Sequence, residues 1–363
     1  MSRKIIFLIL AFFFTSLSLF VIFISIDRDK YFSVESDILL FERVYPKYEN
    51  SKLTEFIQPT FVNEYVNLSN FNYEGKCREP FRYKQNNEKD LVFTAIKYHD
   101  INLWERDKKF IKMTSDMMKN TIPNAKKVCA IYDNFNELSQ FLKECGFEPL
   151  EVKMDDESLK KLNAPMDRFL QLDKYLKEHE GQFERIALID FRDVGFFADG
   201  FQTISEDEVV FTQECVGIKH NHIQCINFKQ GTNYYWFQAT YGKETANKYR
   251  KEKKIITNVG VIIGGFKPFK QLLDVFIEEI NRKKDVLHIW GIDNAMINYL
   301  LYSGKFNGIN VVVNMFTQRL AFNWGYGYNY NKANKSITDL SDGCSPIIRH
   351  KMGGNDLFSF GIS

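Results

Sequence analysis

Short apolar segments alternate with amphipathic ones along the middle of this sequence, and this alternation restricts the fold more than any other feature. The apolar run LVFTAI at residues 91–96 is followed by an amphipathic stretch at 104–119 and then by a second apolar run, KVCAIY, at 127–132. Apolar runs of about four to eight residues rich in β-branched and aromatic side chains are typical of strands, and apolar residues about three or four positions apart are typical of helices. The order strand, helix, strand predicts a parallel sheet with helices packed on it.

The alternation continues to residue 190. The segment 136–147 has apolar residues at helical spacing and Gly146 where a helix would end, and PLEVKM at 149–154 follows as a strand. A helix predicted at 167–179 leads into RIALID at 185–190, an apolar strand of the kind buried in a mainly parallel sheet. We therefore expect an α/β fold with a mixed, mostly parallel sheet flanked by helices.

Two carboxylates stand where this last strand ends. Asp190 and Asp193 belong to the segment IDFRDV, at the carboxyl end of a strand, where such sheets bind ligands. A divalent cation held by one or two carboxylates commonly completes its shell with water and substrate phosphates. The alternative is that the two acids cap a turn or pair with Arg192.

This segment and three others resemble the nucleotide-sugar glycosyltransferases of the GT-A class. IDFRDV at 189–194 is similar to their DxD region, which follows an apolar strand. TNVGVIIGG at 257–265 is similar to their N-(A/T/V)-G-(V/F) segment, and GIDNAMINY at 291–299 resembles their DQxxxN helix start. IRH at 348–350 resembles a late segment whose histidine completes the metal site in several retaining members.

The chain departs from that pattern at two places, and its exact family within the class is unassigned. The acids read Asp-Phe-Arg-Asp rather than Asp-x-Asp, which leaves open which oxygen contacts a metal. Asn294 stands where glutamine is more usual, which affects only the detail of the site.

The resemblance implies a Rossmann-like GT-A fold and a metal-dependent transfer of a sugar. The donor would be a UDP- or GDP-linked sugar, and the acceptor an unidentified glycan, protein or lipid. Asp190, Asp193 and His350 would hold Mn²⁺ or Mg²⁺, and the ion would neutralise charge on the departing nucleoside diphosphate. A surface histidine with no function is the alternative for His350.

Asn258 and Asp293 are the catalytic residues that the resemblance implies. Asn258 would hydrogen-bond sugar hydroxyls beside glycines that permit a close approach, whereas the alternative is a buried strand without a ligand. Asp293 would face the donor sugar or the acceptor, and the alternative is that it caps the helix that follows.

A wider set of residues is expected to bind the nucleotide-sugar donor. This set is Thr94, Ala95, Lys97, Arg168, Asp190 and Arg192. The first three follow the first strand, where such enzymes bind base and ribose, and a lysine there could reach a phosphate. Arg168 could reach the diphosphate from its helix, although a solvated arginine is the alternative.

Aromatic residues at 233–237 and 323–328 could stack on sugar faces. With 34 phenylalanines in the chain, most aromatic residues are expected in the core. The glycines at 325 and 327, within the second stretch, favour an exposed loop, so Trp324 is preferred over Trp236.

A long apolar run near the amino terminus predicts a membrane anchor. Residues 5–26 are almost all apolar, and at about 1.5 Å per residue they could span a hydrocarbon core of about 30 Å. The run passes directly into charged residues at 27–30 without a small-residue cleavage site, which favours a signal anchor over a cleaved signal peptide. With residues 1–4 as a cytoplasmic tail, we expect a single-pass type II protein of the Golgi or endoplasmic reticulum membrane.

The remaining residues would then be lumenal. Residues 27–88 have few periodic apolar runs and are expected to form a stem below a catalytic domain at 89–363, although aromatic residues leave open an irregular subdomain packed on the core for the second half. The glycosylation sequons at Asn67 and Asn334 would be usable only in this orientation, as in a glycoprotein.

Charge and cysteine usage exclude other classes. The chain has 48 Lys and Arg against 46 Asp and Glu, so no basic field predicts nucleic-acid binding. Its six cysteines show no zinc-ligand spacing; Cys215 and Cys225 could form a local bridge or remain buried thiols. A catalytically silent relative that binds glycans or a protein partner is the main alternative function, whereas a hydrolase of the GxSxG type lacks its motif.

Overall fold

A computed structural model describes residues 54–97, 101–132, 136–153, 164–219, 222–228, 231–314, 320–322, 328–339 and 342–350. The apolar run at 5–26, the first half of the expected stem and Trp324 lie outside these residues. Within the described part of the chain, no helix is long and apolar enough to cross a membrane.

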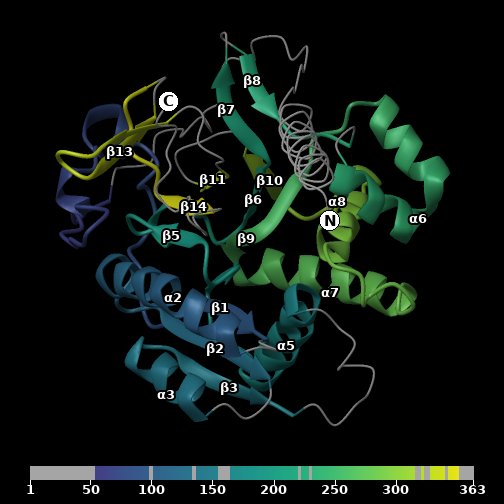
Figure 1. Ribbon diagram of the computed structural model, residues 1–363, viewed down its shortest axis with the longest axis horizontal. Helices are drawn as coiled ribbons and strands as arrows, with labels where there is room; N and C mark the ends of the chain where they lie inside the picture. The colour runs from purple at the N-terminus through teal and green to yellow at the C-terminus, as the bar shows by residue number, and fades with distance from the viewer. Residues whose placement is uncertain are drawn as a thin grey trace, which may run out of the picture. The chain divides into compact units, whose positions relative to one another are not determined.

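A seven-stranded sheet with the order β10-β6-β9-β4-β1-β2-β3 forms the centre of the protein (Figure 1). Its strands are β1 (Asp90–Ile96), β2 (Lys126–Tyr132), β3 (Glu148–Val152), β4 (Arg185–Ile189), β6 (Val209–Gln213), β9 (Thr257–Gly265) and β10 (Val311–Asn314). β9 is antiparallel to its neighbours β4 and β6, and the other pairings in this sheet are parallel. The predicted α/β fold with a mixed, mostly parallel sheet is confirmed.

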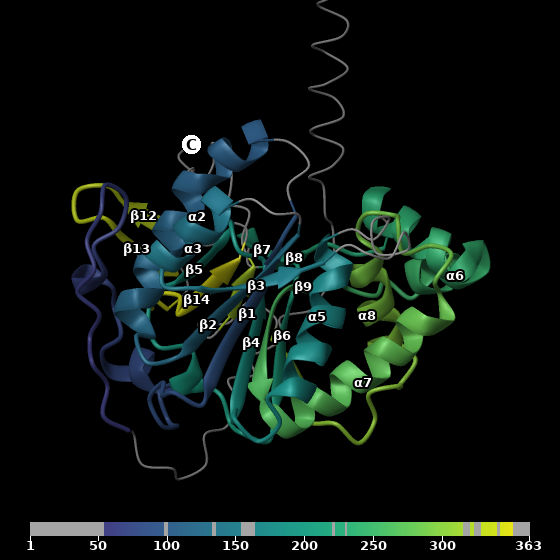
Figure 2. The same ribbon diagram turned by 90° about the horizontal axis from the view of Figure 1, so that it is seen from below.

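Helices cover both faces of this sheet (Figure 2). One face carries α2 (Ile101–Thr121) and α3 (Asn136–Glu144), and the other carries α5 (Ala164–Glu178), α7 (Phe266–Arg282) and α8 (Ile292–Tyr302). Each face therefore buries its own apolar cluster. The strands β4 and β9 are buried along their whole length because they are covered from both sides, as their apolar sequences predict.

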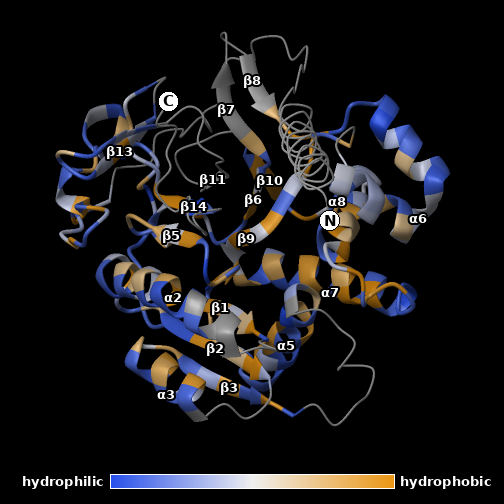
Figure 3. Ribbon diagram, viewed as in Figure 1, coloured by the Kyte–Doolittle hydropathy of each residue, from blue (hydrophilic) through white to orange (hydrophobic). Residues whose placement is uncertain are grey.

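Figure 3 shows hydrophobic residues along the central strands and more hydrophilic ones on the outer turns of α6 (Gly231–Lys251). This helix packs beside α8 and is kinked at Gly242, whose φ of 82° lies in the left-handed region. The helix predicted at 136–147 ends as expected, since Gly146 has a φ of +85° immediately after α3.

Smaller sheets flank the main one. β11 (Leu320–Phe322), β14 (Ile348–His350) and β5 (Val194–Phe196) form a three-stranded sheet in that order. The hairpins are β12–β13 (Tyr328–Asn331 and Ser336–Asp339) and β7–β8 (Cys215–Lys219 and His222–Cys225). A disulfide joins Cys215 to Cys225 at the base of the second hairpin, which answers the question that the sequence left open.

The second half of the expected stem packs on the core, which is the alternative that its aromatic residues left open. Residues 54–88 contain the short 3₁₀ helices η1 (Leu68–Asn70) and η2 (Gly75–Arg78). In this segment, Phe71, Tyr73 and Phe81 are buried in the core. The rings of Phe71 and Phe197 lie 5.1 Å apart, next to β5. The aromatic side chains bury against the smaller sheet, and a disulfide from Cys77 to Cys344 fixes the segment there.

Candidate metal centre

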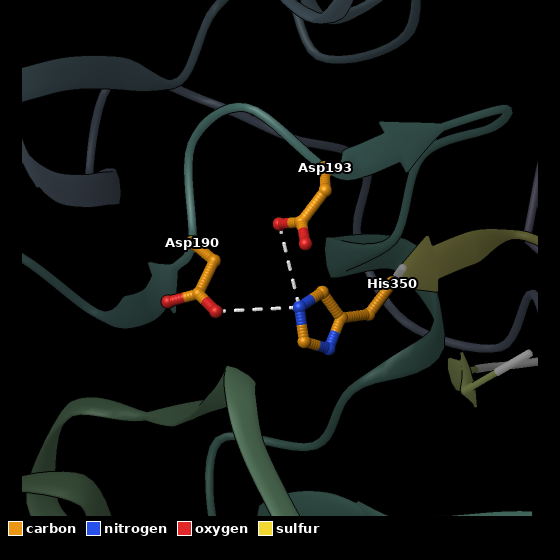
Figure 4. A group of neighbouring side chains, drawn as sticks. All are labelled: Asp190, Asp193 and His350. Carbon is orange, nitrogen blue, oxygen red and sulfur yellow. Dashed lines mark ion pairs between the residues drawn. The ribbon is translucent and has the colours of Figure 1, made fainter. Parts of the chain in front are cut away.

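Asp190, Asp193 and His350 meet at the carboxyl end of β4 (Figure 4). Nε2 of His350 lies 3.3 Å from Oδ2 of Asp190 and 3.4 Å from Oδ1 of Asp193. One potential ligand atom from each residue lies within 4.8 Å of the other two. The sequence placed these residues in one site only through a resemblance, and the structure brings all three together.

Strand pairing explains how a residue so late in the chain reaches this place. Asp190 follows the last residue of β4, and Asp193 precedes the first residue of β5. β14 pairs antiparallel with β5, with His350 opposite Val194. The imidazole is therefore delivered beside Asp193 by backbone hydrogen bonds.

Asn258 fixes which nitrogen of His350 carries a proton. The amide Nδ2 of Asn258 donates to Oε1 of Glu214 at 3.0 Å, and its Oδ1 accepts the N–H of Gly260 at 2.8 Å. These two contacts turn Oδ1 toward Nδ1 of His350, 2.7 Å away, so Nδ1 donates a hydrogen bond. In the neutral imidazole, the lone pair of Nε2 then faces the two carboxylates.

This donor set fits a divalent cation. Two carboxylate oxygens and an imidazole lone pair are ligands that Mn²⁺ accepts, and they converge from three sides. Histidine ligands generally donate their other ring N–H to a carbonyl or a carboxylate, as His350 does to Asn258. A cation between the three groups would also offset the repulsion between the carboxylates of Asp190 and Asp193.

Gly260 is required by the position of the imidazole. A Cβ added at Gly260 would lie 2.0 Å from Cε1 of His350, so the ring rests directly on the glycine backbone. The carbonyl of Gly260 also accepts the N–H of Asp190 at 2.6 Å. We expected the glycines of this strand to admit a sugar, but the space at Gly260 is filled by His350.

Arg168 of α5 is buried in the same site, so the alternative of a solvated arginine is wrong. It forms an ion pair with Asp190, donates to the carbonyl of Val259 at 2.7 Å, and lies 3.7 Å from Oδ2 of Asp293. Desolvation alone would raise the pKa of Asp190, but the charge of Arg168 is the largest of the effects that bring this pKa below its ordinary value.

Asp293 stands in the first turn of α8 rather than at its cap. Gly291 holds the N-cap position with a φ of 80°, so the alternative of an N-cap role for Asp293 is wrong. Burial raises the pKa of Asp293, and the charge of Asp190 raises it further against the opposing effect of Arg168. The two carboxylates of Asp190 and Asp293 thus share the guanidinium of Arg168, and the charge of each group affects the others.

Glu214 is a functional candidate that the sequence reasoning missed. It is buried just after β6, and asparagine amides from three elements point at it: Asn258 at 3.0 Å, Asn233 at 3.4 Å and Asn294 at 3.5 Å. An acid directly after the apolar strand VVFTQ is the same pattern that drew attention to Asp190. Its contact with Asn258 makes Glu214 a positioning residue for His350.

Most of the other predicted donor-binding residues are engaged in structural contacts. Thr94 is fully buried and donates to the carbonyl of Ile189 at 2.9 Å, and Ala95 packs on an apolar cluster. The ammonium of Lys97 lies 5.7 Å from the ring centre of Tyr132, at the carboxyl end of β1. Arg192 pairs with Asp107 at 3.1 Å.

No protein-family model matches this chain, and no curated protein matches its sequence.

Proposed function

We propose that this chain is a metal-dependent glycosyltransferase that moves a sugar from a nucleotide-diphosphate sugar to an acceptor. The observation that carries the proposal is the convergence of Asp190, Asp193 and His350 at the carboxyl end of β4. A diphosphate offers the oxygens that complete the shell of a cation held in this way. The GT-A class, which the four sequence segments resemble, has the same kind of mixed α/β sheet.

Each residue of the site would have a distinct task. Asp190, Asp193 and His350 would hold Mn²⁺ or Mg²⁺. When bound, the ion supplies positive charge against the negative charge that grows on the departing diphosphate. Arg168 holds Asp190 in place, and its guanidinium adds a second positive charge beside the ion site.

Two further residues position groups around that site. Asn258 is buried, with its amide occupied by Glu214, Gly260 and His350, so it orients the histidine rather than contacting a sugar. Asp293 is turned toward Arg168 from the start of α8, on the side of the site formed by that helix. It remains the candidate that would face the donor sugar or the acceptor.

The covalent structure supports a lumenal location. Two disulfides, Cys77–Cys344 and Cys215–Cys225, are typical of proteins that fold in an oxidising compartment. The sequon residue Asn334 is exposed, where an oligosaccharide could be attached. Together with the apolar run at 5–26, these features favour a type II protein of the Golgi or endoplasmic reticulum membrane.

Donor binding by the full-length protein tests this function. A panel of UDP- and GDP-sugars is titrated with and without Mn²⁺, beside Asp193→Asn and the exposed control Asp207→Asn. We expect one donor to bind only with Mn²⁺, Asp193→Asn to weaken this binding by about 100-fold, and the control to match the wild type. Folded protein that binds no nucleotide under any condition would contradict the proposal and favour a silent glycan- or protein-binding relative.

A further inference from the structure

Two exposed aromatic side chains lie on segments that border the metal centre. Among the described residues, four large hydrophobic side chains are exposed: Ile57, Val62, Tyr235 and Trp290. The two aliphatic ones belong to the amino-terminal segment. Tyr235 is 65% exposed near the start of α6, and Trp290 is 58% exposed just before α8, the helix that carries Asp293.

Close contacts connect the start of α6 to the candidate site. Asn233, two positions before Tyr235, has its Nδ2 3.4 Å from Oε2 of Glu214. Glu214 in turn binds Asn258, which binds His350. Only two side chains therefore separate the first turn of α6 from a proposed metal ligand.

A second contact joins α6 to the turn that carries Trp290. A Cβ added at Gly291 would lie 2.2 Å from Cδ2 of Trp236, so the indole of Trp236 rests on this glycine. Gly291 lies between Trp290 and the first turn of α8, where Asp293 is turned toward Arg168. The two exposed rings thus belong to two segments that touch each other beside the site.

The exposure of these rings is not required by packing. α6 is held to the protein through its other face, where Phe237 packs against Phe228 and Tyr249 at ring distances of 4.9 Å. An exposed ring offers a flat apolar face with polar edges, which suits the C–H face of a sugar ring. The amide of Asn233, two positions before Tyr235, can hydrogen-bond hydroxyl groups.

We propose that Tyr235 and Trp290 form an acceptor subsite and that the acceptor presents a carbohydrate ring there. This inference rests on the proposed transferase function, because it names the substrate class that the same site would accept. A carbohydrate suits the surface better than a lipid does, since among the described residues Tyr235 and Trp290 are the only large hydrophobic side chains exposed on these two segments. A lipid chain would need a continuous apolar surface.

Binding of the full-length protein to an array of immobilised oligosaccharides tests the inference, followed by titration of the best binder with intrinsic tryptophan fluorescence. We expect an oligosaccharide to bind without nucleotide, and Tyr235→Ala and Trp290→Ala each to weaken it by about tenfold. Tyr235→Phe and Trp290→Phe keep an aromatic face and should retain most of the affinity. Val62→Ala removes an exposed hydrophobic side chain elsewhere and should change nothing.

Two outcomes would overturn the subsite: no oligosaccharide binds to the folded wild type, or the alanine variants bind as well as the wild type does. Nucleotide and Mn²⁺ binding, measured on the same variants, should be unchanged. Oligosaccharide binding that depends on both rings supports the subsite even if no nucleotide binds, so this inference and the transferase proposal fail separately.

Discussion

The two ends of β4 carry buried charges of opposite character. At its first residue, Arg185 forms a bidentate ion pair with Asp90, with both N–O distances at 2.7 Å and both side chains fully buried. Its remaining N–H groups donate to the carbonyls of Lys84, Gln85 and Phe201. At the other end of the strand, Asp190 and Asp293 both approach the guanidinium of Arg168, and Asp193 approaches the imidazole of His350.

The Arg185–Asp90 pair stabilises the fold, whereas the fold holds the charged groups around Asp190 close together. The pair at the amino end is matched one to one, with its guanidinium hydrogen bonds satisfied, so it needs nothing from outside. At the carboxyl end, Asp190 and Asp293 share the guanidinium of Arg168, and Asp190 and Asp193 both approach the imidazole of His350, an arrangement that a bound cation would stabilise. The same strand therefore has a structural ion pair at its amino end and the candidate metal centre at its carboxyl end.

Breaking the matched pair should have the largest effect on stability. Arg185→Met leaves Asp90 buried without its partner, and we expect a loss of about 3–5 kcal/mol in the free energy of unfolding, measured by denaturant titration. Lys112→Met is the control, because the exposed Lys112 pairs with Asp116 at 2.7 Å on the surface of α2. That control should lose less than about 1 kcal/mol. An equal loss in both variants would contradict the assignment.

Removing a carboxylate at the carboxyl end of β4 should lower Mn²⁺ affinity without lowering stability. Asp193→Asn takes away a negative charge that faces Asp190 and His350, so the melting temperature should stay the same or rise. Mn²⁺ affinity, measured by titration of the free ion's spin resonance signal, should fall by about 100-fold. A variant as unstable as Arg185→Met would show that Asp193 is structural instead.

Gly260→Ala tests whether the position of the His350 imidazole matters for metal binding at the carboxyl end of β4. The new Cβ would lie 2.0 Å from Cε1 of His350, so the ring must move away from the two carboxylates. We expect Mn²⁺ affinity to fall by about 30-fold, within the range seen when groups that orient metal ligands are lost. Gly75→Ala controls for backbone strain away from the site, since its φ is +54° but nothing lies within 4 Å of the added Cβ. Unchanged Mn²⁺ binding in Gly260→Ala would exclude His350 as a ligand.

Glu214→Ala should give the smallest effect on Mn²⁺ binding, because Glu214 reaches His350 through Asn258 rather than directly. Without the carboxylate, the Asn258 amide can turn its nitrogen toward His350 and remove the acceptor for Nδ1. We expect Mn²⁺ affinity to fall by about tenfold. Glu214→Gln keeps an oxygen that Asn258 can donate to and should bind Mn²⁺ nearly as well as the wild type. If the glutamine variant loses as much as the alanine variant, the relay through Asn258 is wrong.

Local patterns in the sequence predicted most of the main sheet. The strands β1 to β4 and the helices between them were expected from apolar periodicity, and the carboxylates after β4 from their position at a strand end. Periodicity also marks β9 as an apolar run, but it does not show that this strand runs antiparallel between β4 and β6. Direction is decided by long-range packing, which a local pattern does not contain.

The parts that were missed depend on contacts between distant segments. The packing of residues 54–88 follows from a disulfide that joins Cys77 to Cys344, across a sequence separation of 267. The buried role of Arg168 and the histidine-orienting role of Asn258 likewise need partners from several elements. Glu214 is different, because its place after an apolar strand was visible in the sequence.

The pairing of β14 with β5 makes the candidate metal centre depend on a stretch of the chain that is not part of the main sheet. All seven strands of the main sheet are present by Asn314, whereas the third ligand of the candidate site arrives only with His350. A polypeptide released between these two points would contain a complete central sheet and yet lack the imidazole. The central sheet and the candidate metal centre therefore depend on different stretches of the chain, and only the metal centre needs β14.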